Sequence, residues 1–403
     1  MKHIAYVCTD ADIPVFGSQG ASIHIQSVVR AILKAGHRVT LFASLFDGPL
    51  PAGLENVTRV HLPEIPYGDM QKRAHAAMQA HHRIIERLDA HAPFDVLYER
   101  YALWSDVGVR WARAHGIPGI LEVNTPLIEE RRQQQQLVLE DAARRITGSA
   151  FSQASVLLAV SPGVARYLHR WPGTRGHVHI VPNGVDPAPF AVCADLRQAR
   201  RVTDKTTTGE TPVVIGFLGQ LQSLPELLML VDAFARVHRQ LPHARLLVVG
   251  DGPARTDMAS ALTARGLLQY SRFTGKVDAS EIPALLAQMD IATAPYPAQP
   301  EFYLSPLKIC EYLAAELPVV TTQVGHLDTL VRQDVDGLLV TPDNAEAFAQ
   351  ALTDLALDPA ARMAMGRHGR QRMVTERSWD SVMAHVLALA EIVRPSLQTL
   401  TIP

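Results

Sequence analysis

A segment in the second half of the chain combines residue types that suit the binding of an anion. Its sequence is FYLSPLKICEYLAA over Phe302–Ala315, in which Pro306 suits the first turn of a helix and Ser305 its cap. Lys308 and Glu311 stand three residues apart and therefore share one helix face. A cation at a helix start opposes the helix dipole unless an anion lies nearby. We therefore predict an anion site at this helix start in preference to a surface ion pair.

Glycine-containing turns after three apolar runs would let the backbone approach a ligand closely. Gly17 and Gly20 follow the first run of the chain, and Gly219, Gly250 and Gly252 follow two consecutive runs in the second half. Ligands of open α/β sheets bind at the carboxyl ends of the strands. Each turn alone could be structural, but two of them at one sheet edge favour a ligand site in the second half.

The elements that must position these residues form a repeating pattern. Short apolar runs alternate with amphipathic stretches, which predicts an α/β fold with two doubly wound parallel sheets. The expected strands span residues 3–8, 38–43, 95–98, 119–123, 156–160, 178–181, 213–218, 245–249, 272–275, 291–294, 319–322 and 337–340. The expected helices include residues 69–91, 126–146, 345–357, 360–373 and 379–392.

Two domains are expected, with a cleft between them as the natural place for chemistry. The first covers residues 1–190, with a C-terminal helix at about 379–403 packing back on it, and the second covers residues 211–378. Proline, glycine and polar residues mark the connection, over 182–190 and 203–212.

Length, charge and cysteine usage exclude several classes of protein. The chain has 403 residues, with 38 Lys and Arg against 40 Asp and Glu and a net charge of −2, so it carries no electrostatic footprint for nucleic acid. Cys8, Cys193 and Cys310 match neither a disulfide framework nor a metal spacing. No signal peptide and no apolar run of about 20 residues is visible. We expect a cytoplasmic protein without a metal or bound cofactor.

Histidines and basic residues gather in the expected helix at 69–91. His75, His82 and His91 do not converge on one helix face, so a metal site is not favoured there. The helix is mildly basic, and Glu86 and Asp89 dilute its charge. A solvated face is the preferred interpretation, and weak contact with a membrane surface is the alternative.

At the Phe302–Ala315 segment the sequence begins to resemble the family 4 glycosyltransferases, and the similarity extends over nearly the whole chain. The matching strings are Gly17-x-x-Gly20-Ala21-Ser22-x-His24, Tyr98-Glu99-Arg100-Tyr101, Glu122-Val123-Asn124-Thr125-Pro126-Leu127, Val181-Pro182-Asn183-Gly184-Val185-Asp186, Gly250-Asp251-Gly252-Pro253, Phe302 through Val320, and Asp336-Gly337-Leu338-Leu339-Val340.

The resemblance implies the GT-B fold, two Rossmann-like domains, and a retaining transfer of sugar from a UDP- or GDP-sugar to an acceptor. It places the acceptor mainly on the first domain and the donor on the second. The residues implied for donor binding are Gly17, Gly20, His24, Gly219, Gln220, Gly250, Gly252, Lys276, Val277, Tyr303, Ser305, Pro306, Leu307, Lys308 and Glu311. Those implied for catalysis are Lys308, Glu311, Asn124 and Glu122.

The sequence departs from the family pattern beside the expected diphosphate site. Gln220, Gln222 and Pro225 replace the usual cations, and Glu226 stands where glycine is usual. Tyr303 occupies the place of the first glutamate of the E-x7-E motif. Two alternatives therefore stay open. One is a weak or inactive homologue that serves another glycosyltransferase as a partner protein or sugar-binding subunit, and the other is a different donor, such as a glycosyl monophosphate.

Overall fold

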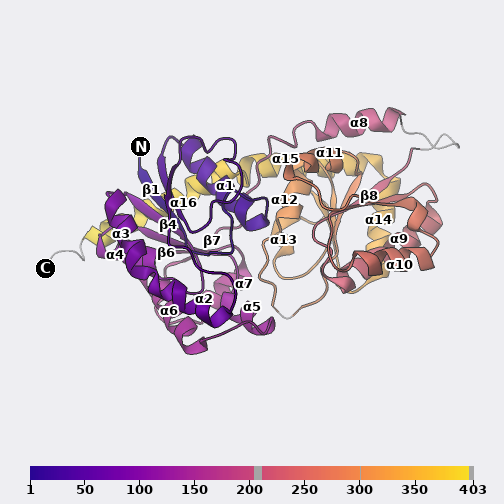
Figure 1. Cartoon of the computed structure of the whole chain (residues 1–403). Helices are drawn as coiled ribbons and strands as arrows, with labels where there is room; N and C mark the ends of the chain where they lie inside the picture. The colour runs from indigo at the N-terminus through magenta and orange to yellow at the C-terminus, as the bar shows by residue number, and fades with distance from the viewer. Residues whose placement is uncertain (204–210, 300, 399–403) are drawn as a thin grey trace. The chain divides into compact units, whose positions relative to one another are not determined.

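The computed structural model describes residues 1–203, 211–299 and 301–398, with side chains described as far as Val393. Most of the connection expected at 203–212 lies outside the described residues. By contacts the chain forms two units (Figure 1). Unit 1 comprises Met1–Asn183, Tyr303–Ser305 and the C-terminal segment from Trp379, and unit 2 comprises Gly184–Phe302 and Pro306–Ser378.

Unit 1 contains a seven-stranded sheet in the order β3-β2-β1-β4-β5-β6-β7, and all of its neighbouring strands are parallel. The strands are β1 His3–Cys8, β2 Arg38–Ala43, β3 Thr58–His61, β4 Val96–Arg100, β5 Gly119–Val123, β6 Val156–Ala159 and β7 Val178–Ile180. The sequence prediction missed β3. This edge strand buries only Val60, so it lacks the apolar run by which the other strands were predicted.

The helices of unit 1 are α1 Gly20–Lys34, α2 Met70–Gln79, α3 His81–His91, α4 Val107–Ala114, α5 Leu127–Gln133, α6 Glu140–Gln153, α7 Pro162–Leu168 and α16 Trp379–Gln398. The single helix expected over 126–146 is wrong, because Gln135 and Leu139 have positive φ angles of 57° and 46° and separate α5 from α6. The helix expected over 69–91 divides at Ala80, whose backbone remains right-handed, so α2 and α3 almost continue each other.

Alternate side chains of β1 contribute to the two apolar clusters on opposite faces of the unit 1 sheet. Ile4, Tyr6 and Cys8 belong to one buried cluster, which also contains apolar residues of α1 and α16. Ala5 and Val7 belong to another, with residues of α3 and α4. Successive side chains of a strand point to opposite faces, so each face of the sheet is covered by its own helices. The last helix of the chain therefore belongs to the core of unit 1.

Unit 2 contains a six-stranded parallel sheet in the order β10-β9-β8-β11-β12-β13. The strands are β8 Val214–Leu218, β9 Arg245–Val249, β10 Ser271–Phe273, β11 Ile291–Ala294, β12 Val319–Thr322 and β13 Gly337–Val340. The helices are α8 Cys193–Thr203, α9 Leu224–Gln240, α10 Arg255–Ala264, α11 Ile282–Leu286, α12 Leu307–Ala314, α13 Leu327–Leu330, α14 Ala345–Leu357 and α15 Pro359–Glu376, with short 3-10 helices at Leu268–Tyr270 and Ala279–Glu281. The predicted α/β class with two parallel sheets is confirmed.

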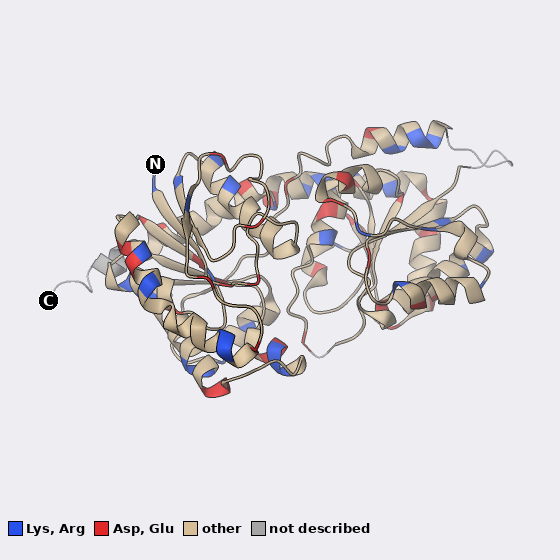
Figure 2. Ribbon diagram, viewed as in Figure 1, with Lys and Arg blue, Asp and Glu red and all other residues tan. Residues whose placement is uncertain are grey.

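Charged residues of both signs occur throughout the described part of the chain (Figure 2). Acidic and basic side chains are interspersed along the helices of both units (Figure 2), in agreement with the net charge of −2. Within the described ranges, none of the helices is both long enough and apolar enough to cross a membrane.

Candidate active site

Glu122 is the centre of a buried polar cluster in unit 1. It lies in β5 next to the end of β4, and it is 3% exposed. Tyr98 and Asn124 donate hydrogen bonds to its carboxylate, and Arg100 Nη1 lies 3.3 Å from Oε1. Burial alone would raise the pKa of Glu122, but His24, Arg100 and Tyr98 together lower it to about 2. The carboxylate is therefore ionised at neutral pH and fully engaged by its neighbours.

His24 connects this cluster to the first glycine-containing turn. It lies on α1, four residues after Gly20, and its Nε2 is 2.7 Å from Glu122 Oε1. The indole of Trp379 packs edge-on against the His24 ring, with 4.9 Å between the ring centroids. Because Glu122 and Trp379 constrain the ring from two sides, His24 has a fixed position at the base of α1.

The turn before α1 owes its shape to one of its two glycines. A Cβ on Gly17 would come within 2.9 Å of the Pro14 side chain, and Gln26 holds the turn by donating to the carbonyls of Val15 and Gly17. A Cβ on Gly20 would meet nothing within 4 Å, so packing of the protein does not require glycine there. Open space at a helix start is what a ligand approaching the backbone would need.

In unit 2, Lys308 lies on α12 in an aromatic and acidic enclosure. Its Nζ is 4.4 Å from the centroid of Phe217 and 5.0 Å from that of Tyr296. Glu226, in the first turn of α9, accepts a hydrogen bond from Nζ at 3.2 Å. Burial lowers the pKa of Lys308, and the Glu226 carboxylate opposes that shift. The acid that departs from the family pattern is thus the counter-ion of the expected phosphate-binding lysine.

Glu311 follows Lys308 by one turn of α12 but does not pair with it. Its carboxylate has no hydrogen-bond or ion-pair partner among the described residues, and burial raises its pKa to about 7. An unpartnered, partly buried carboxylate is costly in the free protein unless a ligand supplies donors. The hydroxyl groups of a ribose would be suitable donors.

The glycines of unit 2 allow two backbone turns to touch. Gly250 has a φ of +128°, and a Cβ there would come 2.0 Å from the carbonyl oxygen of Gly219. A Cβ on Gly252 would lie 2.5 Å from the carbonyl oxygen of Leu221. Gly219 has a φ of +149°, and a Cβ there would lie 3.3 Å from the Lys308 ammonium. These close approaches bring the ends of β8 and β9 together beside Lys308.

The prediction of Ser305 as a helix cap is wrong. The residue before α12 is Pro306, and no side chain accepts a capping hydrogen bond there. Ser305 instead bonds within unit 1: its Oγ accepts from the Asn183 amide, and its carbonyl accepts from Asn183 Nδ2, each at 3.2 Å. Tyr303 also counts with unit 1, where its carbonyl accepts from Ser161 Oγ at 2.7 Å.

The remaining predicted residues are surface or packing positions. Gln220 and Lys276 are exposed, while Val277 packs against the apolar core of unit 2. Pro306 and Leu307 lie at the start of α12. In the described part of the chain, no group of three or more His, Cys, Asp and Glu side chains is arranged to hold a metal ion.

Sequence reasoning overlooked the partners that hold the predicted residues. Arg100 and Tyr98 were noticed only as part of a matching string, although both contact Glu122. The pairing of Glu226 with Lys308 joins residues 82 positions apart. Spacing along the sequence cannot detect contacts between residues so far apart. Tyr98 and Arg100, however, are two positions apart at the end of β4, so the sequence could have predicted that they lie on the same face of the sheet.

Two parallel α/β sheets with polar side chains and tight glycine turns at the carboxyl ends of their strands are typical of the GT-B fold, and similar solved structures confirm that fold. Sucrose-phosphate synthase from Thermosynechococcus elongatus is similar with a TM-score of 0.71 and 20% identity, covering 98% of this chain and 100% of that one. Anabaena HepE, solved in complex with UDP and glucose, is similar with a TM-score of 0.69 and 17% identity, covering 97% and 100%.

The sequence comparisons identify the family. The family model described as Glycosyltransferase Family 4 matches residues 18–189, and the one described as Glycosyl transferases group 1 matches residues 212–358. The D-inositol 3-phosphate glycosyltransferase of Salinispora tropica is 28% identical over 392 residues, covering 91% of this chain and 80% of that protein. Glycogen synthase of Mycobacterium tuberculosis is 28% identical over 239 residues, covering 59% and 51%. The chain belongs to the family 4 glycosyltransferases.

Proposed function

We propose that this protein transfers a sugar, with retention of configuration, from a nucleotide-sugar donor such as a UDP- or GDP-sugar to a hydroxyl group of an acceptor. The single observation that carries the proposal is that α12 presents a half-buried lysine and, one turn later, a carboxylate without a partner among the described residues. Lys308 would bind the diphosphate and Glu311 would accept hydrogen bonds from the ribose. The complex of the similar HepE with UDP and glucose supports the same class of donor.

The chemistry follows from what the residues can and cannot do. With a pKa of about 2, Glu122 is too weak a base to take a proton from the acceptor at neutral pH. In same-face attack, the bond between the anomeric carbon and the diphosphate oxygen breaks as the acceptor oxygen bonds to that carbon. The acceptor proton passes to the departing diphosphate. Lys308 stabilises the negative charge that develops on this leaving group.

The unit 1 cluster has a positioning role in this proposal. Glu122 holds the Asn124 amide and the His24 ring in fixed orientations. Asn124 is then our candidate for a hydrogen bond to a sugar hydroxyl, and neither residue needs to exchange a proton. No metal ion is required, because Lys308 and the amides at the start of α12 supply the positive charge. Activity should therefore persist in excess EDTA.

Donor binding is tested by the thermal stability of the whole chain with UDP, GDP, ADP and their sugar conjugates. A ligand at 100 times its dissociation constant stabilises the folded state by about 2.7 kcal/mol. Lys308→Ala and Glu311→Ala should each abolish the shift, and the exposed Lys276→Ala, also in unit 2, should weaken it much less. If no nucleotide raises the melting temperature, the hypothesis of an inactive partner subunit replaces this one.

Sugar transfer itself is tested with the donor that gives the largest shift. Release of the nucleoside diphosphate, measured with a panel of acceptors, should depend on both donor and acceptor. The acceptor named for the curated relative, D-inositol 3-phosphate, belongs in that panel beside uncharged glycosides. A donor that binds without any acceptor-dependent release would favour a sugar-binding subunit.

A further inference from the structure

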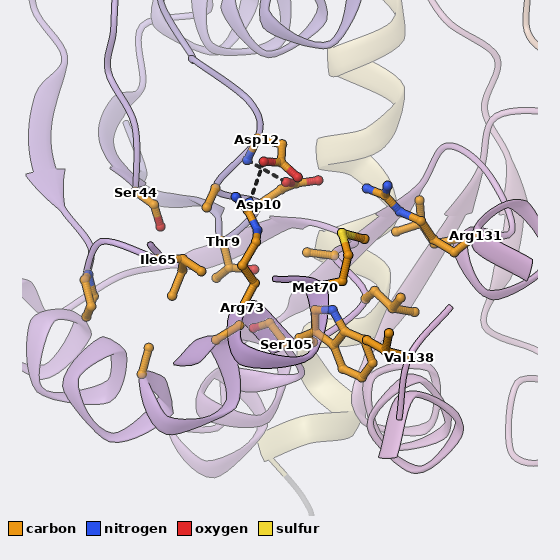
Figure 3. Close-up of a pocket in the computed structure, with 18 of the residues that line it drawn as sticks. Thr9, Asp10, Asp12, Ser44, Ile65, Met70, Arg73, Ser105, Arg131 and Val138 are labelled. Atoms are coloured by element: carbon orange, nitrogen blue, oxygen red, sulfur yellow. Dashed lines mark hydrogen bonds and ion pairs between the residues drawn. The ribbon is translucent and has the colours of Figure 1, made fainter. Parts of the chain in front are cut away.

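A cavity in unit 1 lies at the carboxyl ends of β1, β2, β3 and β4, beside α2 and α3 (Figure 3). The space that a water-sized sphere can occupy in it is about 90 Å³, and its mouth is open to solvent. It lies at the sheet edge where open α/β domains bind their ligands. None of the residues proposed above for donor binding lines this cavity.

Most of the cavity wall is apolar. The large apolar side chains that line it are Ile65, Met70, Ile84, Leu103, Trp104, Leu127 and Val138. Met70 is 37% exposed. An apolar wall makes few hydrogen bonds to a fully polar ligand. Contact with an aliphatic or aromatic group would remove apolar surface from water and so stabilise binding.

The other side of the cavity is polar and close to electrically neutral. Asp12 forms an ion pair with Arg73, with 2.5 Å between Asp12 Oδ1 and Arg73 Nη2. Arg131 points toward Asp10, and it donates to Gln136 Oε1 at 2.8 Å (Figure 3). The two carboxylates and two guanidinium groups thus balance in charge.

One polar atom at this side lacks a partner. The hydroxyl oxygen of Thr9, a residue that lines the cavity, is buried and makes no hydrogen bond to any described residue. A buried hydroxyl without a partner costs free energy, and a ligand hydroxyl could restore the missing bond. A phosphate group is a poor candidate here, because Asp10 and Asp12 would repel it, Arg73 is already paired, and Arg131 interacts with Asp10.

We infer that this cavity binds the acceptor, and that the acceptor is an uncharged glycoside or polyol carrying an alkyl or aryl group. Its hydroxyl groups would lie toward Thr9, Asp10 and Asp12, and its apolar group would lie along Met70, Ile84 and Trp104. That the ligand is an acceptor rests on the proposed function, whereas its chemical class rests on the cavity alone.

The test is calorimetric titration of the nucleotide-free protein with n-hexyl β-D-glucopyranoside, glucose, and D-myo-inositol 3-phosphate. We expect saturable binding of the hexyl glucoside, binding of glucose at least tenfold weaker, and no binding of the inositol phosphate. Thr9→Val keeps the shape of the side chain and removes the hydroxyl, so it should weaken hexyl glucoside binding about fivefold.

A matched pair of variants on α2 locates the binding site. Ala77 lines the cavity and the neighbouring Ala76 does not, although both are half-buried. Ala77→Phe should fill part of the cavity and abolish hexyl glucoside binding, while Ala76→Phe should leave it within twofold. Should Ala77→Phe fail to fold, Thr9→Val decides the question.

Three results would overturn the inference: no binding of the hexyl glucoside, equal binding of glucose and hexyl glucoside, or binding of the inositol phosphate that Ala77→Phe abolishes. The titration contains no nucleotide, so its outcome is independent of donor binding. A protein that binds the glycoside but no nucleotide contradicts only the proposed transfer. A protein that binds a nucleotide but no glycoside contradicts only the acceptor class.

Discussion

At the scale of single residues, three carboxylates have very different environments, and each allows a separate test. Burial without a partner raises the pKa of Glu311, several neighbouring groups lower the pKa of Glu122, and Glu226 is paired with Lys308 of the expected donor site. Sequence alone assigned all three the same chemical type. The neighbours of each carboxylate decide whether it is ionised and how much free energy its burial costs.

Glu311→Gln should stabilise the nucleotide-free protein at pH 8. Burial raises the pKa of Glu311 from 4.5 to about 7, so the folded state binds this proton more tightly than the unfolded state. The carboxylate costs nothing extra below about pH 4.5, and its full cost is present above pH 7. Urea unfolding at pH 8 should show a gain of roughly 1–3 kcal/mol for the variant, shrinking by pH 5. A gain that does not depend on pH, or an equal gain from the exposed Glu64→Gln, would contradict this account.

Glu122→Gln should have the opposite effect at neutral pH. The substitution leaves the buried Arg100 guanidinium without its counter-ion, and losing one member of a buried pair costs about 3–5 kcal/mol. Because the pKa of Glu122 is lowered to about 2, its stabilising charge is present above the unfolded value of 4.5 and is lost as the pH falls toward 2. Denaturation at pH 7 and pH 3 measures both effects.

Tyr98→Phe is the matched control for Glu122→Gln. It removes one hydrogen bond to the same carboxylate and keeps the charge, so its cost should be about 1 kcal/mol. If both variants lose the same free energy, the stability of the cluster does not depend on its ion pairs.

Glu226→Gln should increase affinity for the nucleotide donor. The Glu226 carboxylate competes with the diphosphate for the Lys308 ammonium, at a distance of 3.2 Å. Removing its charge should improve the dissociation constant of UDP or GDP about tenfold, which is about 1.4 kcal/mol. Isothermal titration gives the value. Glu346→Gln alters an acid in the first turn of another unit 2 helix and should leave affinity unchanged. Weaker binding by Glu226→Gln would show that this acid assists the donor.

At the scale of elements, α16 is the clearest case of a helix whose place depends on tertiary packing. Its residues Met383, Val386 and Ala390 belong to the same buried cluster as β1 and α1. Its apolar stripe was visible in the sequence, and the helix was expected to pack back on the first domain. The stripe alone does not select a partner, because either sheet could accept an amphipathic helix.

Met383→Ala should therefore destabilise the protein by about 2–5 kcal/mol, since a side chain that is 1% exposed leaves a cavity in unit 1. Thermal and urea unfolding measure the loss. Met363→Ala on α15 provides the control, because that methionine is 54% exposed and should cost less than about 0.5 kcal/mol. Comparable losses for the two variants would mean that α16 contributes little to the core of unit 1.

Element boundaries show where sequence patterns lose their information. The strands β1, β2, β5, β9, β11 and β12 begin and end where their apolar runs do, because both faces of a central parallel strand are buried. The edge strand β13 also has its expected bounds. The helix expected over 126–146 is interrupted because Gln135 and Leu139 have positive φ angles. A positive φ cannot be predicted from a glutamine or a leucine in the sequence. The capping role expected for Ser305 fails because Asn183, far away in sequence, binds it instead.

At the scale of the whole molecule, the sequence by itself determined the α/β class, the two parallel sheets and the family. The alternation of apolar and polar residues and the order of the motifs are local properties of the sequence, so these features can be predicted without knowing which distant residues are in contact. Only the tertiary structure decided that Glu226 faces Lys308 and that Glu122 gathers Tyr98, Arg100, Asn124 and His24. These contacts depend on how strands and helices meet in space. Charge, pKa and ligand preference are set by such neighbours, so they follow from packing.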